Sequence, residues 1–138
     1  MSPIEIQCRC GAVQLHISAD PVAQIYCHCD DCRAAHGGAY VASAIYPATA
    51  VQARGGALTE GQVKSTPRLR CAACATHLFS EITAAGLRSV NAFLLPAGAF
   101  QPHMHVQCQH ALLPVVDALP HFKAFPPAFG GSDERVSW

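Results

Sequence analysis

Three cysteines lie close together at Cys27, Cys29 and Cys32, in the pattern C-x-C-x-x-C. A free thiol has a pKa of about 8.5, and three thiolates held together would repel one another. A soft divalent cation removes that repulsion, because Zn²⁺ binds thiolate sulfur at about 2.3 Å and displaces the thiol protons. We therefore expect these three cysteines to be ligands of a zinc ion.

Three cysteines fill three of the four positions of a tetrahedral zinc ion. Structural zinc sites use four protein ligands, whereas catalytic sites keep one position for water or substrate. The spacing alone leaves both possibilities open, because His28, His36 or a distant group could complete a closed site. His28 lies between two of the cysteines, and it is the histidine that we expect to reach the open position or to relay protons.

Four further cysteines form two pairs that are distant in the sequence, Cys8 with Cys10 and Cys71 with Cys74. Two such turns that face each other supply four thiolates, which predicts a closed structural zinc site. Apparent zinc-binding free energies are on the order of 10–16 kcal/mol, so this site would hold the N-terminal hairpin to the middle of the chain. Thioredoxin-like redox chemistry is the alternative for a C-x-x-C pair, but its βαβ context is not visible here. Gly11 suits the turn beside the first pair.

Three further residues of types that can bind metal lie on one predicted strand or at its end: His103, His105 and Cys108. A lone cysteine is more often a buried apolar residue than a ligand, so we interpret Cys108 in that way and keep a fourth-ligand role as the alternative. His103 and His105 share one face of the strand because they are two residues apart. No third ligand is close to them in the sequence, which favours ordinary strand residues over a metal pair.

Composition and charge exclude several classes of function. The chain has 138 residues, a formal net charge of zero, 51% hydrophobic and 13% charged residues. The neutral balance argues against binding to nucleic acid or to an anionic membrane surface. The N-terminus lacks the pattern of a signal peptide, and the most apolar stretch, residues 90–100, is too short to span a bilayer. We expect a cytoplasmic protein whose eight cysteines serve metal binding, with a secreted disulfide protein as the alternative.

Short alternating segments separated by glycine and proline predict a mainly β fold with one or two short helices. A helix is expected around residues 32–36, with Asp30 or Asp31 as its N-cap and Gly37-Gly38 at its end. We expect a single domain over residues 1–138, with an irregular, proline-rich C-terminal portion from about 114 to 138 and a mobile end from 130. The predicted strands cover residues 4–8, 13–17, 22–26, 39–46, 51–53, 62–65, 68–70, 77–82, 89–95 and 102–107. Pro67 is expected to divide the strand at 62–65 from the strand at 68–70.

The order of these motifs resembles the glutathione-dependent formaldehyde-activating enzyme family, which includes the centromere protein V-like proteins. The resemblance rests on C-x-C-G, on C-H-C-x-x-C-R followed by glycines, and on a C-x-x-C preceded by Arg68. It extends to residues 102–105 and 117–122. The resemblance implies a β-tent of antiparallel sheets stapled by two zinc ions. It assigns the structural zinc to Cys8, Cys10, Cys71 and Cys74, and the catalytic zinc to Cys27, Cys29 and Cys32.

The resemblance also implies a reaction in which formaldehyde and glutathione form S-hydroxymethylglutathione, the reverse being a carbon–sulfur lyase step. An open zinc ion can take up a thiol sulfur or polarise an aldehyde oxygen. Three thiolates leave the site with a net negative charge, which favours thiol capture and positioning over strong Lewis-acid activation. We expect a small thiol and an aldehyde as partners, no nucleic acid and no membrane, and Arg33 and Arg9 as partners of the thiol's carboxylates.

The sequence departs from the family pattern at three places. Arg70 stands where the family usually has an aromatic residue, Ala75 where it has glycine, and Leu112 or a neighbour where it has tryptophan. Ala75 costs stability if its φ is positive. These departures leave two alternatives open, a related enzyme acting on another thiol or aldehyde and a non-enzymatic, zinc-stapled protein-binding module with the Pro/Phe-rich C-terminal portion as its support. Iron in place of zinc is the alternative metal.

Overall fold

The computed structural model describes residues 3–138, and these form a mainly β structure with one short α-helix. The residues group into two compact units. The first consists of Met1–Ala23 and Ala44–Phe100, and the second of Gln24–Ser43 and Gln101–Trp138. The expectation of a mainly β fold is confirmed, whereas the expectation of a single domain over residues 1–138 stays a prediction.

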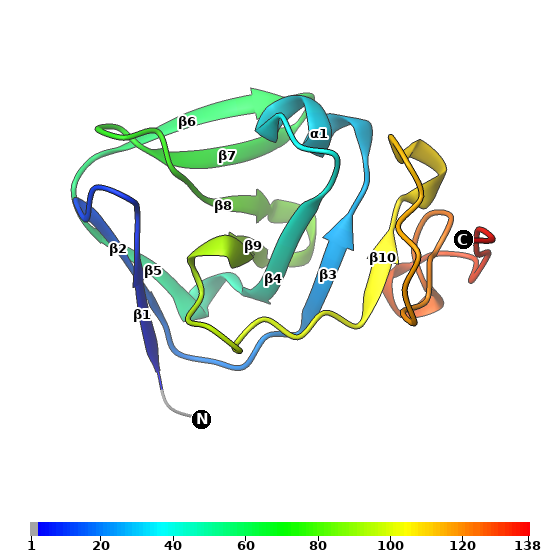
Figure 1. Ribbon diagram of the computed structural model, residues 1–138. Coiled ribbons are helices and arrows are strands. Elements are labelled where there is room, and N and C mark those ends of the chain that lie inside the picture. The colour runs from blue at the N-terminus through cyan, green and yellow to red at the C-terminus, as the bar shows by residue number, and fades with distance from the viewer. Residues whose placement is uncertain (1–2) are drawn as a thin grey trace. The chain divides into compact units, whose positions relative to one another are not determined.

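A three-stranded antiparallel sheet in the first unit follows directly from the alternating sequence near the N-terminus. Its strands are β1 (Ile4–Gln7), β2 (Val13–Ile17) and β5 (Val51–Gly55), hydrogen-bonded in the order β1-β2-β5 (Figure 1). Ile6 pairs with Leu15, and both side chains are buried. Residues two apart in a strand point to the same face, so this alternation places one apolar face of the sheet toward the core.

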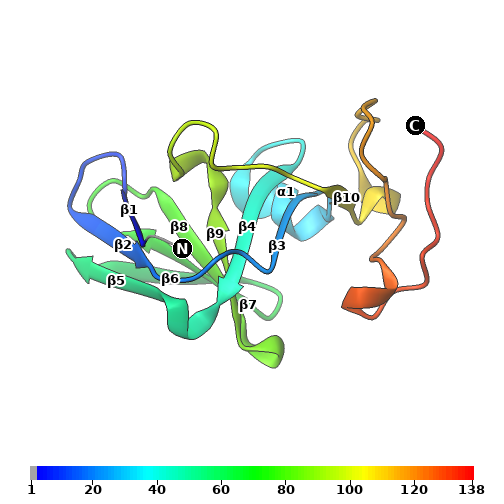
Figure 2. The same cartoon turned by 90° about the horizontal axis from the view of Figure 1, so that it is seen from below.

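Four more strands of the first unit form an antiparallel series, β9-β8-β7-β6 (Figure 2). They are β6 (Leu58–Val63), β7 (Thr66–Cys71), β8 (His77–Ile82) and β9 (Leu87–Asn91). The prediction that Pro67 divides two strands is wrong, because Pro67 lies within β7 opposite Gln62 and the turn falls earlier, between Val63 and Thr66. The predicted strand at 89–95 is shorter than expected, because a 3-10 turn at Ala92–Leu94 follows β9.

The core of the first unit consists of aliphatic and aromatic side chains from these strands together with two of the cysteines. A buried aliphatic side chain contributes about 1.5–3 kcal/mol relative to its exposed state, so this cluster accounts for much of the unit's stability. Its buried members are Ile6, Cys8, Val13, Leu15, Ile17, Ala44, Tyr46, Val51, Cys71, Leu78, Phe79 and Val90. Cys8 and Cys71 are therefore anchored in the core.

The second unit is built on a parallel pair of short strands. β3 (Ala23–Cys27) pairs with β10 (Met104–Val106), and the single helix α1 (Asp30–His36) follows β3. A parallel pair requires a long connection, which the residues between β3 and β10 supply. β4 (Val41–Pro47) begins in the second unit and continues into the first.

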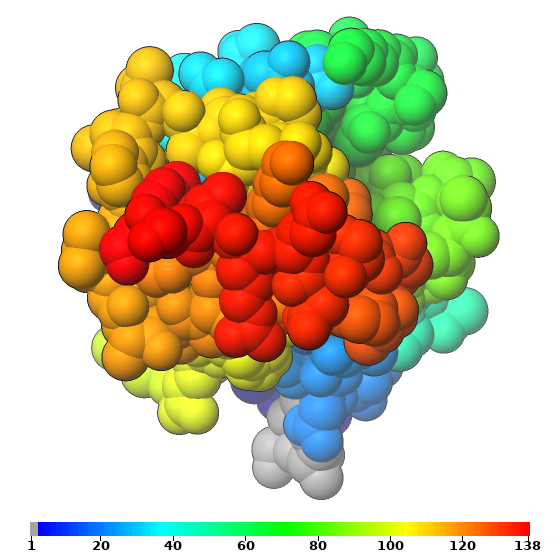
Figure 3. Space-filling view, turned by 90° about the vertical axis from the view of Figure 1, so that its right-hand side faces the viewer, coloured from blue at the N-terminus to red at the C-terminus, as the bar shows by residue number. Residues whose placement is uncertain are grey.

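The residues after β10 have no regular sheet, as the sequence predicts, and they form a continuous surface of the second unit (Figure 3). Short 3-10 turns at Cys108–His110 and Pro127–Phe129 interrupt them. Residues near the C-terminus make hydrogen bonds to the rest of the second unit, and the expected mobility of the end stays a prediction. Val136 N donates to His121 O at 2.9 Å, and Lys123 N donates to Glu134 O at 2.8 Å. In the described part of the chain, every helix is too short or too polar to cross a bilayer.

Candidate functional site

The first unit brings Cys8, Cys10, Cys71 and Cys74 together, as the sequence predicts. The four sulfur atoms lie within 4.8 Å of one another. Cys10 Sγ is 3.7 Å from Cys8 Sγ and 3.8 Å from Cys71 Sγ. Four sulfurs at about 2.3 Å from a tetrahedral zinc ion are about 3.8 Å apart, so the donor set and its spacing fit zinc. A disulfide requires about 2.05 Å, and all four cysteines are free thiols.

Two tight turns hold this four-cysteine cluster. In the first, Gly11 has a φ of +79°, which is the conformation expected for it, and Val13 N donates to Cys8 Sγ at 3.3 Å. In the second, which joins β7 to β8, Ala75 N donates to Cys71 O at 2.8 Å and Ala75 has a φ of +64°. Ala75 thus occupies a left-handed conformation that favours glycine.

The acidities of these thiols differ strongly. The pKa of Cys74 is lowered to about 5, mainly because the Thr76 hydroxyl and backbone N–H stabilise its thiolate. An N–H of the backbone at Ala12 lowers the pKa of Cys10, but the Cys74 and Cys8 thiols together raise it to about 11. Neighbouring thiols therefore compete for protons, and a divalent cation removes that competition because it binds all of them as thiolates.

The second unit brings Cys27, Cys29 and Cys32 together at the end of β3 and the start of α1. These three cysteines, called the cysteine trio below, have sulfur atoms within 4.8 Å of one another, and Cys32 Sγ is 3.8 Å from Cys27 Sγ. That separation is again the tetrahedral edge of about 3.8 Å. Among residues 3–138, no fourth cysteine, histidine, aspartate or glutamate belongs to this group. The trio therefore offers three protein ligands where the other cluster offers four.

Helix α1 positions the trio. Its N-cap is Cys29, whose sulfur accepts a hydrogen bond from Cys32 N at 3.1 Å. The predicted N-cap, Asp30 or Asp31, is wrong, because the helix begins one residue earlier and the cysteine sulfur takes the role of the capping oxygen. The helix ends at Gly37, which has a φ of +69° and whose N–H donates to Arg33 O at 2.8 Å.

The neighbouring thiols of the trio change the acidity of Cys27. Hydrogen bonds to Cys29 and Cys32, together with burial, raise its pKa well above the ordinary value of a thiol. A group in this environment stays protonated at neutral pH unless a positive charge is supplied. The thiol chemistry of the trio thus fits a soft cation such as zinc.

The two arginines expected to bind carboxylates lie in different units. Arg33 is on α1 directly after Cys32, and its Nε is buried with no hydrogen-bond partner. Arg9 is exposed beside the four-cysteine cluster of the first unit, where its backbone N–H donates to Thr76 Oγ1 at 3.2 Å. Of the two, Arg33 is the cation that shares a unit with the trio.

His28 does not belong to the group formed by the cysteine trio, although it lies between two of its members. Adjacent residues of an extended chain point to opposite sides, so His28 is turned the other way. It is fully buried, and its Nε2 lies 2.8 Å from His105 Nδ1. Burial, followed by the charges of His105, His121 and Arg33, lowers the pKa of His28 to about 4. His28 thus takes part in a network of histidines.

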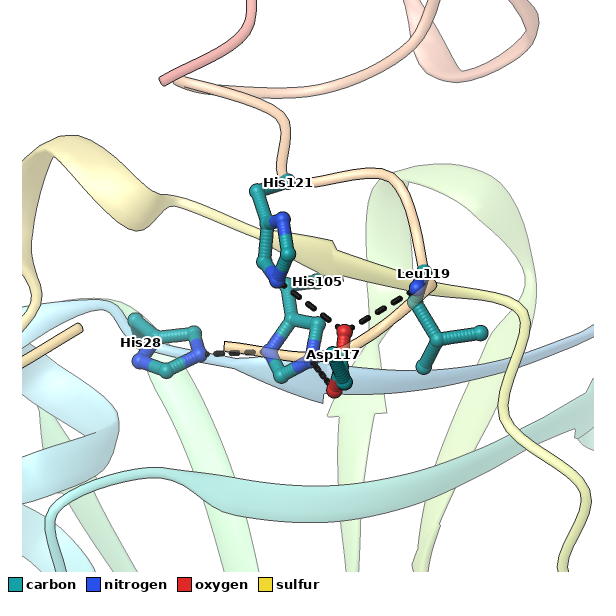
Figure 4. A network of polar contacts seen from close by, with 5 residues as sticks. All are labelled: His28, His105, Asp117, Leu119 and His121. Carbon is teal, nitrogen blue, oxygen red and sulfur yellow. Dashed lines mark hydrogen bonds and ion pairs between the residues drawn. The ribbon is translucent and has the colours of Figure 1, made fainter. Parts of the chain in front are cut away.

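That network contains a third group of metal-binding side chains, which the sequence did not predict. It consists of His105, Asp117 and His121, whose ligand atoms lie within 4.8 Å of one another (Figure 4). His105 Nε2 is 2.8 Å from Asp117 Oδ2, and His121 Nε2 is 3.1 Å from Asp117 Oδ1. Burial raises the pKa of Asp117, but hydrogen bonds from His105 and Leu119 outweigh it, so the pKa lies below its ordinary value.

The remaining predicted candidates, His103 and Cys108, have structural roles. His103 Nε2 accepts a hydrogen bond from Gln24 N at 3.1 Å and belongs to no metal-binding group of the described residues. Cys108 is buried, and burial together with the charge of Asp117 raises its pKa to about 11. The interpretation of Cys108 as a buried apolar residue agrees with this placement.

Comparisons with known proteins agree with the motifs. The sequence profile of the family described as glutathione-dependent formaldehyde-activating enzyme matches residues 3–111. A crystal structure of a Rhodobacter sphaeroides protein aligns with a TM-score of 0.57 at 20% sequence identity. The alignment covers 68% of this chain and 89% of that chain, and at this identity it shows a similar fold alone. A search of curated proteins found no match.

Proposed function

Because the chain belongs to the family of glutathione-dependent formaldehyde-activating enzymes, we propose that it joins a glutathione-like thiol to a small aldehyde at the cysteine trio. The thiol sulfur forms a bond to the aldehyde carbon, and the proton of the thiol ends on the aldehyde oxygen. With glutathione and formaldehyde the product is S-hydroxymethylglutathione, and the reverse reaction is a carbon–sulfur lyase step. The observation that carries this proposal is the contrast between a group of four sulfurs and a group of three.

We propose two zinc ions with different roles. Cys8, Cys10, Cys71 and Cys74 would hold a structural ion with all four positions filled, consistent with the 3.7 and 3.8 Å sulfur separations. Cys27, Cys29 and Cys32 would hold the second. When bound there, zinc supplies a fourth position that a substrate sulfur or oxygen can occupy.

The chain's own residues would bind and orient the thiol. Arg33 carries a positive charge next to Cys32, and its buried Nε has an unused hydrogen. A carboxylate of a glutathione-like thiol would pair with this guanidinium, which can donate two parallel hydrogen bonds. The net negative charge of three thiolates on one divalent ion favours capture and positioning of the thiol over strong activation of the aldehyde.

The test is exchange NMR on a mixture of glutathione and formaldehyde, with native protein and with Cys32→Ser. We expect native protein to accelerate the interconversion of glutathione and its hydroxymethyl adduct, and the variant to lose that acceleration. Cys108→Ala is the matched control, since this cysteine lies in the same unit but outside the trio. It should retain the native rate.

Equal acceleration by native protein and Cys32→Ser would show that the trio is not the reacting site. No acceleration by native protein, with glutathione or with other small thiols, would overturn the proposed activity. A binding module would also require Cys32→Ser and Cys71→Ser to unfold the protein equally, whereas an enzyme with separate structural and catalytic ions predicts a milder loss of stability at Cys32.

A further inference from the structure

Three nitrogen and oxygen donors converge in the second unit from places that are well separated along the chain. His105 is on β10, Asp117 is in the irregular stretch after it, and His121 forms a parallel bridge beside His105. The backbone fixes the two histidines side by side, because His105 N donates to Pro120 O at 2.9 Å and Phe122 N donates to His105 O at 3.0 Å. None of these three side chains belongs to either cysteine cluster.

One of the three candidate ligand atoms is buried but makes no hydrogen bond within the protein. His121 Nε2 is buried and has no hydrogen-bond partner, although it lies 3.1 Å from Asp117 Oδ1. The contact is short but not aligned as a hydrogen bond, and Asp117 Oδ1 already accepts one from Leu119 N at 3.0 Å. A buried polar atom without a partner destabilises the folded state, so the native chain would gain from a ligand that this nitrogen can bind.

Neighbouring residues hold His105 and Asp117 in fixed orientations through hydrogen bonds, as is usual for metal ligands. Metal-binding histidines usually hydrogen-bond through their other ring nitrogen, which fixes the ring. His105 does so, because its Nδ1 lies 2.8 Å from His28 Nε2 (Figure 4). The Asp117 carboxylate is fixed by Leu119 N, and the ring of Trp138 packs against His121 with centroids 5.0 Å apart.

We propose that His105, Asp117 and His121 bind a first-row divalent transition-metal ion, such as zinc, cobalt or iron, separately from the cysteines. Two imidazoles and one carboxylate favour these ions, whereas magnesium and calcium prefer oxygen donors alone. Ligands at about 2.0–2.2 Å from such an ion are about 3.3 Å apart, so the observed 2.8 and 3.1 Å contacts need to widen by only a few tenths of an ångström. Asp117 is 32% exposed, which gives the ion a route in.

The test is to add Co²⁺ to the full-length protein after both cysteine clusters have been filled with zinc. We expect one further equivalent of Co²⁺ to bind and to give weak visible absorption without the intense near-ultraviolet band of a thiolate–cobalt bond. Asp117→Asn keeps the shape of the side chain but removes its charge, and it should weaken this binding by about 100-fold or more. His110→Ala is the control, because His110 is an exposed histidine of the same unit.

Three results would overturn the proposal. These are no binding of Co²⁺ to the native protein, binding accompanied by a thiolate–cobalt band, and equal binding by native protein and Asp117→Asn. The first two results are obtained with the native protein alone. They therefore test the proposal even if the Asp117→Asn variant fails to fold. Since the cysteines are occupied by zinc throughout, the outcome does not depend on the proposed thiol–aldehyde reaction.

Discussion

The distances between the cysteine sulfur atoms match those expected around a bound zinc ion. Three sulfur–sulfur separations, two in the first unit and one in the second, are 3.7, 3.8 and 3.8 Å. They match the edge of a zinc–thiolate tetrahedron, which is about 3.8 Å. Hydrogen bonds from backbone N–H groups to the sulfur atoms of Cys8 and Cys29 also favour a bound cation, because such bonds stabilise the thiolate form that binds it.

The left-handed backbone conformation of Ala75 lowers the stability of the protein. Its φ of +64° costs an L-residue about 1–2 kcal/mol, and glycine largely avoids this cost. We therefore expect Ala75→Gly to raise the free energy of unfolding by about 1 kcal/mol. Chemical denaturation of the zinc-loaded protein measures the change.

Ala72→Gly, in the same turn between β7 and β8, is the control, because Ala72 is not among the residues with positive φ. There glycine only adds freedom to the unfolded chain, so stability should fall slightly or stay the same. If Ala75→Gly also failed to stabilise the protein, the left-handed conformation at this position would not be a source of strain.

The grouping of the cysteines could be predicted from the sequence, whereas the grouping of His105 and His121 with Asp117 could not. Seven cysteines are grouped by short spacings, so their two sets could be predicted from composition and pattern. The group of His105, Asp117 and His121 depends on a parallel bridge between residues that share no motif. The only signal in the sequence is an aspartate four residues before a histidine, which is too common to predict a site.

Helix α1 is the element on which the proposed chemistry depends. It supplies Cys32 and Arg33, and its N-cap is another member of the trio, Cys29. A helix of this length gains little stability from its own hydrogen bonds. Its two ends are therefore important for holding the trio in place.

Gly37 ends this helix with a φ of +69°, and an added Cβ would have no atom within 4 Å. A larger residue at position 37 would therefore meet no steric clash, and only the positive φ would disfavour it. We expect Gly37→Ala to lower the free energy of unfolding by about 1 kcal/mol and to weaken zinc binding at the trio in proportion. A denaturation curve and a competition with a zinc chelator measure the two effects.

The neighbouring residue gives a matched control. Gly38 does not have a positive φ, and an added Cβ would lie 3.4 Å from Tyr40 O, an ordinary contact distance. Gly38→Ala should therefore leave both quantities nearly unchanged. An equal loss in the two variants would mean that the helix end does not act through the conformation of Gly37.

At the element scale, the strands with regular alternation were predicted well and the interrupted ones were not. β2 has the predicted bounds, since its apolar residues alternate without a break. Pro67 misled the prediction, because a proline in a strand is excluded only where its N–H is required by the neighbouring strand. The parallel pairing of β3 with β10 could not be predicted either, because it joins segments that are distant in the sequence.

The whole chain contains one tryptophan, Trp138, and its environment allows the single-domain prediction to be tested. Its ring packs against His28 and His121 in the second unit. Far-UV circular dichroism reports mainly on strands, and most of these are in the first unit. If residues 1–138 form one cooperative domain, the two signals should follow the same denaturation curve.

Two separate midpoints would contradict the prediction of one domain and would show that the units unfold independently. Zinc should be kept in excess in this experiment, because structural zinc binding contributes on the order of 10–16 kcal/mol and would otherwise dominate the comparison. The variant Trp138→Phe shows how much of the fluorescence signal comes from this residue.

We propose that the cysteine trio presents an open coordination position to a thiol. The decisive experiment is to fill the cysteine clusters with Co²⁺ and to add glutathione to the native protein, to Cys32→Ser and to Cys108→Ala. We predict that the thiolate–cobalt absorption of the native protein and of Cys108→Ala rises to saturation as one further sulfur is bound, and that Cys32→Ser shows no such rise. If glutathione leaves the native spectrum unchanged, the trio does not bind the thiol and the protein does not catalyse the proposed thiol–aldehyde reaction there.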